Sequence, residues 1–302
     1  MKDSRWKAIL QQAFGHVRRW TRRPRGFGAA PEPAQPRLAL AFGGGFARGL
    51  AHIGVLKVLE ENRVGIHHLV GTSVGSLIAG AYASGVPLTE IRAVAGRVEW
   101  KDFGQWTLSR MGLATNQRLE AFVRRTFRAL RFEDLKIPLA IVATDLLNGR
   151  AVVFTSGPLG LAVRASCAYP GLFLPVAYDG GWLVDGGLVS EVPTCVARDQ
   201  GADVVVGVAL QNLKFGLEPK SVVDVLGRSI NIAQQAAEPV WRDCADLVVE
   251  PEVSEFRWDD FARCDELVAA GEAAMRARLP RLLELLQPSA ARAAAERTAP
   301  AV

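Results

Sequence analysis

A chain of 302 residues, 49% of them hydrophobic, can bury one large core or two ordinary ones, which excludes a wholly disordered protein. Its net charge of +5 is unevenly placed: residues 1–26 hold eight basic side chains and one acidic, a net +7, which leaves 28 basic and 30 acidic residues in the remainder. A body without surplus positive charge gives no sign of a groove for a phosphate backbone, so no nucleic-acid partner is expected.

The N-terminal segment places apolar residues at near-helical intervals between arginines over residues 6–20, and prolines follow. The pattern predicts a basic amphipathic arm and a Pro-rich linker over 1–36. Such a helix suits an anionic membrane surface, which makes residues 1–26 a candidate peripheral contact. A solvated arm, or one that docks on its own domain, explains the pattern equally well. The Ala- and Arg-rich residues 288–302 are expected to form a disordered tail.

Between these ends, over 37–287, short apolar runs alternate with longer amphipathic stretches. Strands are expected at residues 38–42, 66–70, 139–143, 152–154, 182–184, 204–209 and 247–249. Helices are expected at residues 50–61, 77–84, 118–130, 161–168, 193–200, 222–241 and 261–286. The alternation predicts an α/β domain with a mostly parallel central sheet covered on both faces.

The four cysteines show neither CxxC spacing nor nearby histidines: Cys167, Cys195, Cys244 and Cys264. They are therefore expected to be buried free thiols in a reducing compartment rather than metal ligands. No apolar run approaches the ~18 residues that a spanning helix needs, and Gln11 and Gln12 interrupt the apolar stretch that an export signal needs. The sequence thus predicts a cytoplasmic protein without a metal or other cofactor.

The first motif that carries chemistry is Gly71-Thr72-Ser73-Val74-Gly75, between a predicted strand and a predicted helix. Small residues on both sides of a serine allow the strained turn of a nucleophile elbow, which raises the hydroxyl above the sheet. The N–H groups at the start of the following helix then favour negative charge on that hydroxyl. The pattern also occurs in purely structural turns, so its interpretation as a nucleophile elbow depends on the other motifs of the chain.

The second motif is a glycine loop, Gly43-Gly44-Gly45, which also lies between a strand and a helix and is followed by Arg48. One interpretation is a dinucleotide loop, but Arg48 takes the place of its third glycine. The other is an oxyanion hole, in which the loop N–H groups stabilise a tetrahedral intermediate. Arg48 then orients the loop or attracts an anionic headgroup.

The third motif is Asp185-Gly186-Gly187, where an aspartate leaves a predicted strand. Alone it is an ordinary Asp-Gly turn. No histidine follows residue 68, whereas a Ser-His-Asp hydrolase on an α/β sheet places its histidine after both the serine and the acid. The sequence therefore favours a dyad in which Asp185 takes the serine proton, with His52 a helix residue near the glycine loop.

Together the motifs resemble the patatin-like phospholipase family. The resemblance covers most of residues 37–255, through LAFGGGFARGLAHIGVL at 40–56, GTSVGS at 71–76, ASCAYPGLF at 165–173 and VDGGLVSEVP at 184–193. It implies a three-layer α/β/α fold, no metal and lipid acyl esters as substrates. Carried over, Ser73 is the nucleophile, Asp185 the base, Gly43, Gly44 and Gly45 the oxyanion loop, and Gly71 and Gly75 the elbow glycines.

Two departures accompany the resemblance. Plant members have one residue fewer between the third glycine and the arginine, so the chain resembles the bacterial branch, which leaves open which loop N–H groups form the hole. The turn after Asp185 reads Asp-Gly-Gly rather than Asp-Gly-Ala. Besides an acyl hydrolase, a catalytically idle regulatory or scaffolding protein and a dinucleotide-binding module remain as alternatives.

The family resemblance suggests roles for two further segments. Trp100, Phe103, Trp106, Leu108, Met111 and Leu113 cluster without a clean period, which suits a lid, an acyl-binding wall or the packing of a short helical excursion. Residues 169–175 are candidates for lining an acyl pocket.

Overall fold

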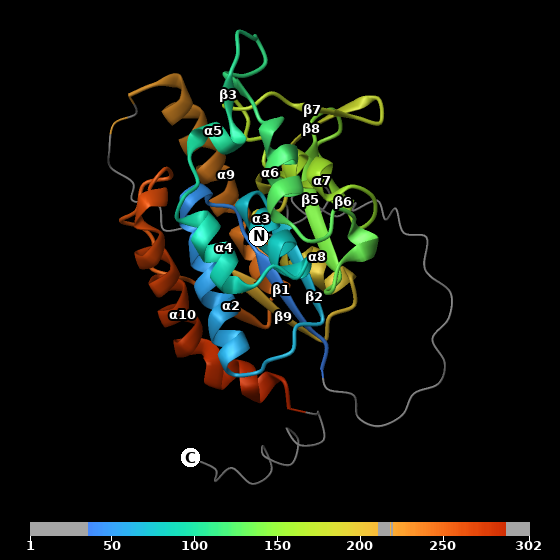
Figure 1. Ribbon diagram of the computed structural model, residues 1–302, viewed down its shortest axis with the longest axis vertical. Coiled ribbons are helices and arrows are strands. Elements are labelled where there is room, and N and C mark those ends of the chain that lie inside the picture. Colours follow the sequence, from blue (N-terminus) through green and yellow to red (C-terminus); the bar gives the residue numbers. More distant parts are fainter. Residues whose placement is uncertain (1–35, 211–217, 219, 288–302) are drawn as a thin grey trace, which may run out of the picture.

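The computed structural model describes residues 36–210, 218 and 220–287, so the predicted basic arm and the predicted tail lie outside the described residues. The centre of the molecule is an eight-stranded sheet with the order β10-β9-β1-β2-β5-β8-β7, and β6 pairs with β5 (Figure 1). The five parallel strands are β1 (Leu38–Phe42), β2 (His68–Thr72), β5 (Leu139–Asp145), β9 (Val204–Val208) and β10 (Leu247–Val249). Three antiparallel strands complete the sheet: β6 (Arg150–Phe154), β7 (Val176–Tyr178) and β8 (Gly181–Asp185).

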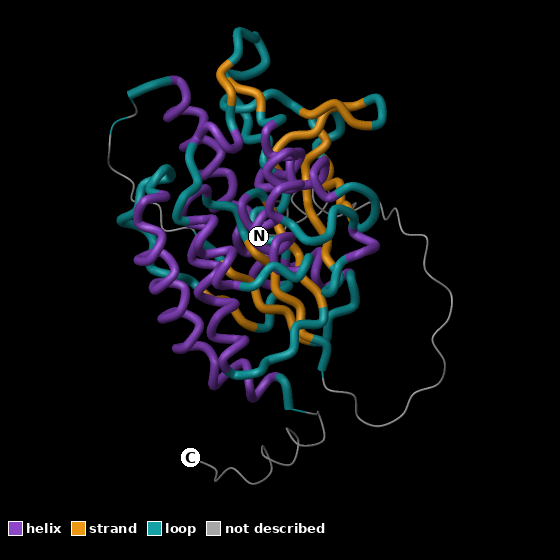
Figure 2. Tube along the Cα trace, in the orientation of Figure 1, coloured by secondary structure: helices purple, strands orange, loops and turns teal. Residues whose placement is uncertain are grey.

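Helices cover both faces of the sheet. Because side chains of a strand alternate between faces, Leu38, Leu40 and Phe42 of β1 enter one apolar core, and Ala39 and Ala41 enter the other. The larger core is shared with α2 (Ala51–Glu61), α3 (Val74–Ala83), α4 (Leu88–Ala95), α6 (Arg118–Thr126), α7 (Leu159–Ser166) and α10 (Cys264–Leu285). The smaller core is shared with α8 (Thr194–Asp199) and α9 (Val222–Asp243). The predicted three-layer α/β/α arrangement is confirmed (Figure 2).

Short elements connect these layers. Five of them are η1 (Phe46–Leu50), η2 (Phe132–Asp134), η3 (Gly186–Leu188), η4 (Phe261–Arg263) and α5 (Trp100–Phe103). The strands β3 (Gln105–Trp106) and β4 (Ala114–Thr115) pair as a separate hairpin, which projects at the top of the molecule in Figure 1.

The disulfide between Cys195 and Cys244 corrects one expectation. Both cysteines were expected to be free thiols, and only Cys167 and Cys264 are free. The bridge ties α8 to the end of α9, segments that lie 49 residues apart in sequence, a proximity that spacing along the chain does not reveal. The expectation of a reducing compartment depended in part on four free cysteines, and the disulfide removes that support. Among the described residues, no helix is long and apolar enough to cross a bilayer.

Candidate active site

The pairing of β5 brings the ends of β2 and β8 together. Thr72, the last residue of β2, lies opposite Val142 of β5, and Asp185, the last residue of β8, lies opposite the next residue, Ala143. The other edge of β5 is occupied by β6 along this stretch, so β2 and β8 share one edge and approach each other from opposite directions. Ser73 and Asp185 therefore meet at the carboxyl end of β2, although 111 positions separate them in sequence.

Ser73 forms a strained turn at the start of α3. Its φ of 54° and ψ of −128° are unusual for a residue with a side chain, and Ser73 is the N-cap of α3. The flanking glycines permit this turn by close packing rather than by special dihedral angles. A methyl group on Gly75 would lie 2.3 Å from the Phe42 carbonyl oxygen, and one on Gly71 would lie 2.5 Å from Ser76 Cα. The local geometry is that of a nucleophile elbow.

Ser166 fixes the backbone of this turn. Its fully buried hydroxyl accepts a hydrogen bond from the Ser73 N–H at 2.8 Å and donates one to the Val142 carbonyl at 2.6 Å. Ser166 thus joins the end of α7 to both the elbow and β5. Ser166 lies in one of the motifs that carry the family resemblance, but no role was predicted for it.

The glycine loop lies directly over the serine. A methyl group on Gly44 would lie 3.4 Å from Ser73 Cβ. The Gly43 N–H donates to the Val208 carbonyl at 3.1 Å, and the Gly44 N–H donates to the Glu191 carbonyl at 3.3 Å. Within the described part of the chain, no hydrogen bond uses the N–H of Gly45. Two of the three predicted donors thus hold the loop in place.

His52 contacts the backbone of the glycine loop. It is fully buried on α2, stacks on Phe42 at 4.4 Å, and donates from Nε2 to the Gly43 carbonyl at 3.0 Å. Burial lowers the pKa of His52 to about 4, and the Gly43 carbonyl opposes that shift. The imidazole is therefore neutral near pH 7, and its Nε2 is committed to the loop backbone.

Asp185 is buried, with 4% of its surface exposed. Its Oδ1 accepts a hydrogen bond from the Gly187 N–H at 2.8 Å, and its Oδ2 has no hydrogen-bond partner among the described residues. Burial raises its pKa to about 6, while the Ser73 hydroxyl and the Gly187 N–H lower it. The Ser73 hydroxyl thus lies near enough to affect the pKa of the carboxyl, but it makes no hydrogen bond to Oδ2.

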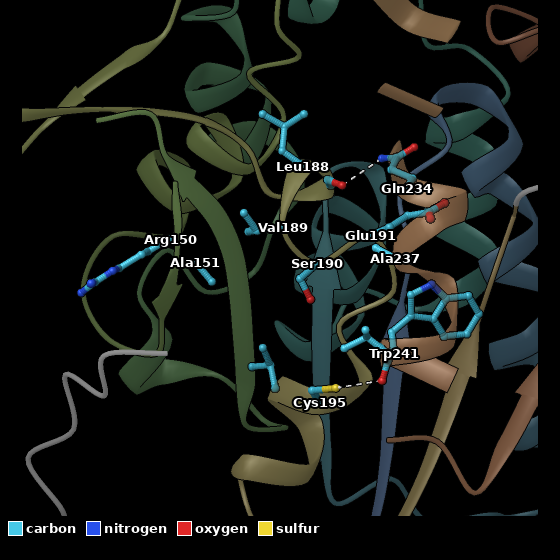
Figure 3. Close-up of a pocket in the computed structure, with 13 residues that line it drawn as sticks. Arg150, Ala151, Leu188, Val189, Ser190, Glu191, Cys195, Gln234, Ala237 and Trp241 are labelled. Atoms are coloured by element: carbon cyan, nitrogen blue, oxygen red, sulfur yellow. Dashed lines mark hydrogen bonds between the residues drawn. The ribbon is translucent and has the colours of Figure 1, made fainter. Parts of the chain in front are cut away.

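The turn after Asp185 is held by close packing. A methyl group on Gly186 would lie 2.2 Å from the Val142 carbonyl oxygen, so this position requires a glycine. Gln234 of α9 donates to the Gly187 carbonyl at 2.9 Å (Figure 3). Gln234, like Ser166, was not singled out from the sequence, because its contact depends on how α9 packs.

A cavity of about 370 Å³ opens over these groups. Ser73, Asp185, Gly44 and Gly45 lie on its floor, and Arg48 lines it as well. Burial lowers the pKa of Arg48, and the nearby Glu191 and Tyr169 act in the opposite direction. One wall is the polar face of α9: Asp224, Arg228, Asn231 and Gln234. The other walls are largely apolar: Phe46, Trp106, Leu113, Tyr169, Leu172, Leu210 and Trp258.

A second cavity, of about 80 Å³, is lined by residues that include Ser190, Gln234 and Trp241 (Figure 3). It shares Gly187, Glu191 and Gln234 with the larger cavity, but neither Ser73 nor Asp185 lines it. The paired hydroxyl and carboxylate belong to the larger cavity.

Comparison with known proteins relates the chain to a family. The family model described as patatin-like phospholipase matches residues 40–198. A Mycobacterium tuberculosis protein described as an uncharacterized NTE family protein is 35% identical over an alignment of 216 residues, and the match covers 65% of this chain and 56% of that protein. Lysophospholipase NTE1 of Yarrowia lipolytica is 33% identical over 177 residues, which are 57% of this chain and 12% of that protein.

A solved structure agrees in fold. The crystal structure of VipD from Legionella pneumophila superposes with a TM-score of 0.51 at 12% sequence identity, covering 87% of this chain and 72% of that one. The chain spans about half the length of the mycobacterial relative. The matched family residues make up more than half of the chain and include Ser73, Asp185 and the glycine loop, so the chain belongs to the patatin-like phospholipase family.

Proposed function

We propose that the protein is a serine acyl-ester hydrolase that acts on lipid esters through a dyad of Ser73 and Asp185. The observation that carries the proposal is the meeting of these two side chains beneath the glycine loop, at the floor of a single largely apolar cavity. Membership of a phospholipase family, and a relative named as a lysophospholipase, support a lipid ester as the substrate class.

In the acylation step, Ser73 Oγ attacks the ester carbonyl carbon while its proton moves to Asp185. Oδ2 suits this transfer because Oδ1 is already bound by the Gly187 N–H. Negative charge develops on the former carbonyl oxygen, and the Gly45 N–H is the loop donor left to stabilise it, with Gly43 and Gly44 holding the loop rigid. The N-terminus of α3 favours the same charge.

The intermediate collapses when the C–O bond to the alcohol breaks and the alcohol takes the proton from Asp185. The acyl group then remains as an ester of Ser73. A water molecule gives a proton to Asp185 and attacks this ester, and collapse of the second intermediate returns the proton to Ser73 and releases the carboxylic acid. Arg48, on the cavity wall, orients the loop and adds positive charge for an anionic headgroup.

Hydrolysis of p-nitrophenyl esters and lysophospholipids by purified variants tests the proposal. Ser73→Ala is expected to lose nearly all activity, and Asp185→Asn to lose about 10²–10⁴-fold, the usual contribution of a positioned base. Asp145→Asn is the matched control, because Asp145 ends the neighbouring strand but bonds to its own loop at Leu147 and Asn148. Activity near the wild-type level in folded Ser73→Ala rejects this dyad, and an inactive wild type favours a regulatory member of the fold.

A further inference from the structure

The β3–β4 hairpin carries large apolar side chains into solvent. Leu108 at its tip is fully exposed, at 106% of the reference area, and Trp106 is 64% exposed. Met111 and Leu113 are 49% and 45% exposed. Single exposed apolar residues are ordinary on protein surfaces, but four within eight positions of one projecting hairpin form a patch that requires an explanation.

The base of this hairpin is firmly packed. Trp106 stacks on Trp100 at 4.9 Å, and Trp100 stacks on Phe173 at 5.6 Å. The Leu113 N–H donates to the Leu172 carbonyl at 3.1 Å, and the Leu174 N–H donates to the Ala114 carbonyl at 2.9 Å. The aromatic stack and these bonds hold the tip away from the core, so the exposure of Leu108 is built into the fold.

The apolar surface of the hairpin continues into the cavity above Ser73. Trp106 and Leu113 line that cavity, while Leu108 and Met111 do not. Along the chain, the two outer residues lie between the two inner ones, so one apolar strip leads from the tip of the hairpin to its base at the cavity. In Figure 1 the hairpin lies at the end of the molecule toward which the carboxyl ends of β2 and β5 point.

The charge of the hairpin also restricts its partner. No acidic residue occurs between Asp102 and Glu120, whereas Arg110 lies two residues after Leu108 at the tip. Arg118 follows the hairpin, and its Nη1 donates to the Lys101 carbonyl at 3.0 Å. An apolar tip flanked by cations is suited to the boundary of a phospholipid layer, because its apolar atoms enter the acyl region while the guanidinium groups reach the phosphates.

We infer that the β3–β4 hairpin is an interfacial docking element, which inserts Leu108 and Met111 into the surface of a phospholipid aggregate and aligns the cavity with it. The inference deepens the proposed function and rests on it, because a lipid layer would then be the source of the substrate. A lipid molecule leaving the layer along Trp106 and Leu113 reaches Ser73 without crossing water.

Vesicle binding of the full chain tests the inference. The probe is unilamellar vesicles of diether phosphatidylcholine at 150 mM salt, which contain no ester to hydrolyse and no net charge to attract basic segments. Leu108→Asp is expected to lower the vesicle-bound fraction by about tenfold or more, since it replaces an apolar side chain at the point of insertion with a charge. Leu283→Asp is the matched control, because Leu283 is 45% exposed near the end of α10, far from the hairpin.

A soluble short-chain ester separates docking from chemistry. Leu108→Asp should hydrolyse that ester at the wild-type rate and lose activity only toward lipid in aggregates, while Ser73→Ala loses both. Equal vesicle binding by wild type and Leu108→Asp, or no binding by either, overturns docking and leaves the dyad untouched. A wild-type dimer that Leu108→Asp converts to a monomer, with vesicle binding unchanged, also overturns docking and assigns the hairpin to a second copy of the chain.

Discussion

Asp185 combines two properties that oppose each other at the residue scale. As the proposed base it must be ionised to accept the Ser73 proton, yet it is buried, which disfavours its charged form and raises its pKa to about 6. The Gly187 N–H and the Ser73 hydroxyl recover part of that cost. The raised pKa makes the carboxylate a stronger base than an exposed aspartate.

A pH profile follows from this pKa. The value of kcat/KM for a soluble ester should rise as pH increases through about 6 and level off above it, because only the ionised Asp185 accepts the proton. Steady-state rates between pH 4.5 and 8.5 measure the profile. A profile that stays flat from pH 5 to 8 would contradict the assignment of Asp185 as the base.

The same pKa predicts how Asp185 affects folding stability. Because the folded pKa lies above the ordinary value of 3.8, the folded state binds the proton more tightly than the unfolded state does. The carboxylate therefore reduces stability as pH rises from about 4 to above 6, by a total on the order of 3 kcal/mol. Asp185→Asn lacks this charge, so its free energy of unfolding relative to wild type should increase over the same pH range. Chemical denaturation of both proteins at pH 4 and pH 7.5 tests the direction of this change. The same difference in free energy of unfolding at the two pH values would refute it.

Ser166 provides a prediction about positioning. Ser166→Ala leaves the Ser73 N–H and the Val142 carbonyl without a partner, which should cost about 1–3 kcal/mol of stability and lower kcat by about tenfold with little change in KM. Ser84→Ala is the matched control. Ser84 is also buried, donates to the Ala81 carbonyl and accepts from the Arg128 N–H, but it lies away from the cavity.

The two serine variants separate structure from function. Both should lose similar stability in thermal melts, and only Ser166→Ala should lose turnover. Equal activity of the two variants would mean that Ser166 has no part in holding the elbow.

The site residues that could be predicted from the sequence are those whose chemistry is visible in the side chain or in a glycine pattern. Ser73, Asp185 and the glycine loop fall in that class, and the structure brings them to one cavity. Ser166, His52 and Gln234 act through backbone atoms of distant segments. Which backbone atom a buried polar side chain meets depends on packing between helices, and no local pattern encodes it.

At the scale of elements, the crossing of α2 and α10 fixes the helix that carries His52. Two glycines let the helices touch: a methyl group on Gly54 would lie 2.0 Å from the Val268 carbonyl oxygen, and one on Gly271 would lie 1.9 Å from the Ala51 carbonyl oxygen. Neither contact involves a flexible side chain, so neither helix can accommodate an added carbon without moving.

Gly271→Ala should therefore destabilise the protein by about 3 kcal/mol, the upper part of the usual range for overpacking. Gly96→Ala is the control, because Gly96 has helical dihedral angles at the end of α4 and its nearest neighbour to an added carbon is 3.6 Å away. Urea denaturation measures both variants. Equal midpoints would show that the α2–α10 contact is looser than its geometry implies.

Most elements of the sheet and its helices could be predicted because they are buried. The strands expected at 38–42 and 247–249 are β1 and β10, and the strand expected at 66–70 lies two residues later, at His68–Thr72. The elements missed include α4, α5, β7 and the β3–β4 hairpin. The strands among them are two or three residues long, too short to show an alternation. They form through contacts with distant residues: the hairpin bonds to residues 172–174, and β7 pairs with β8.

At the scale of the whole molecule, long-range pairing decides where the site lies. β5 aligns β2 with β8, α7 anchors the elbow, and α9 closes one wall of the cavity. The Cys195–Cys244 disulfide adds a covalent tie between α8 and α9, and the sequence pattern predicted neither this tie nor its partners. The family motifs indicated which segments meet, and only the folded chain shows the geometry with which they do so.

Labelling with a fluorophosphonate, followed by peptide mass spectrometry of the intact folded chain, tests the nucleophile most directly. Such reagents react with a serine whose hydroxyl is activated, so the account predicts one adduct per chain, on the peptide that contains Ser73, and none in Ser73→Ala. Labelling should fall steeply in Asp185→Asn, which lacks the base. An adduct on a different residue, or none in a chain that hydrolyses acyl esters, would contradict the account.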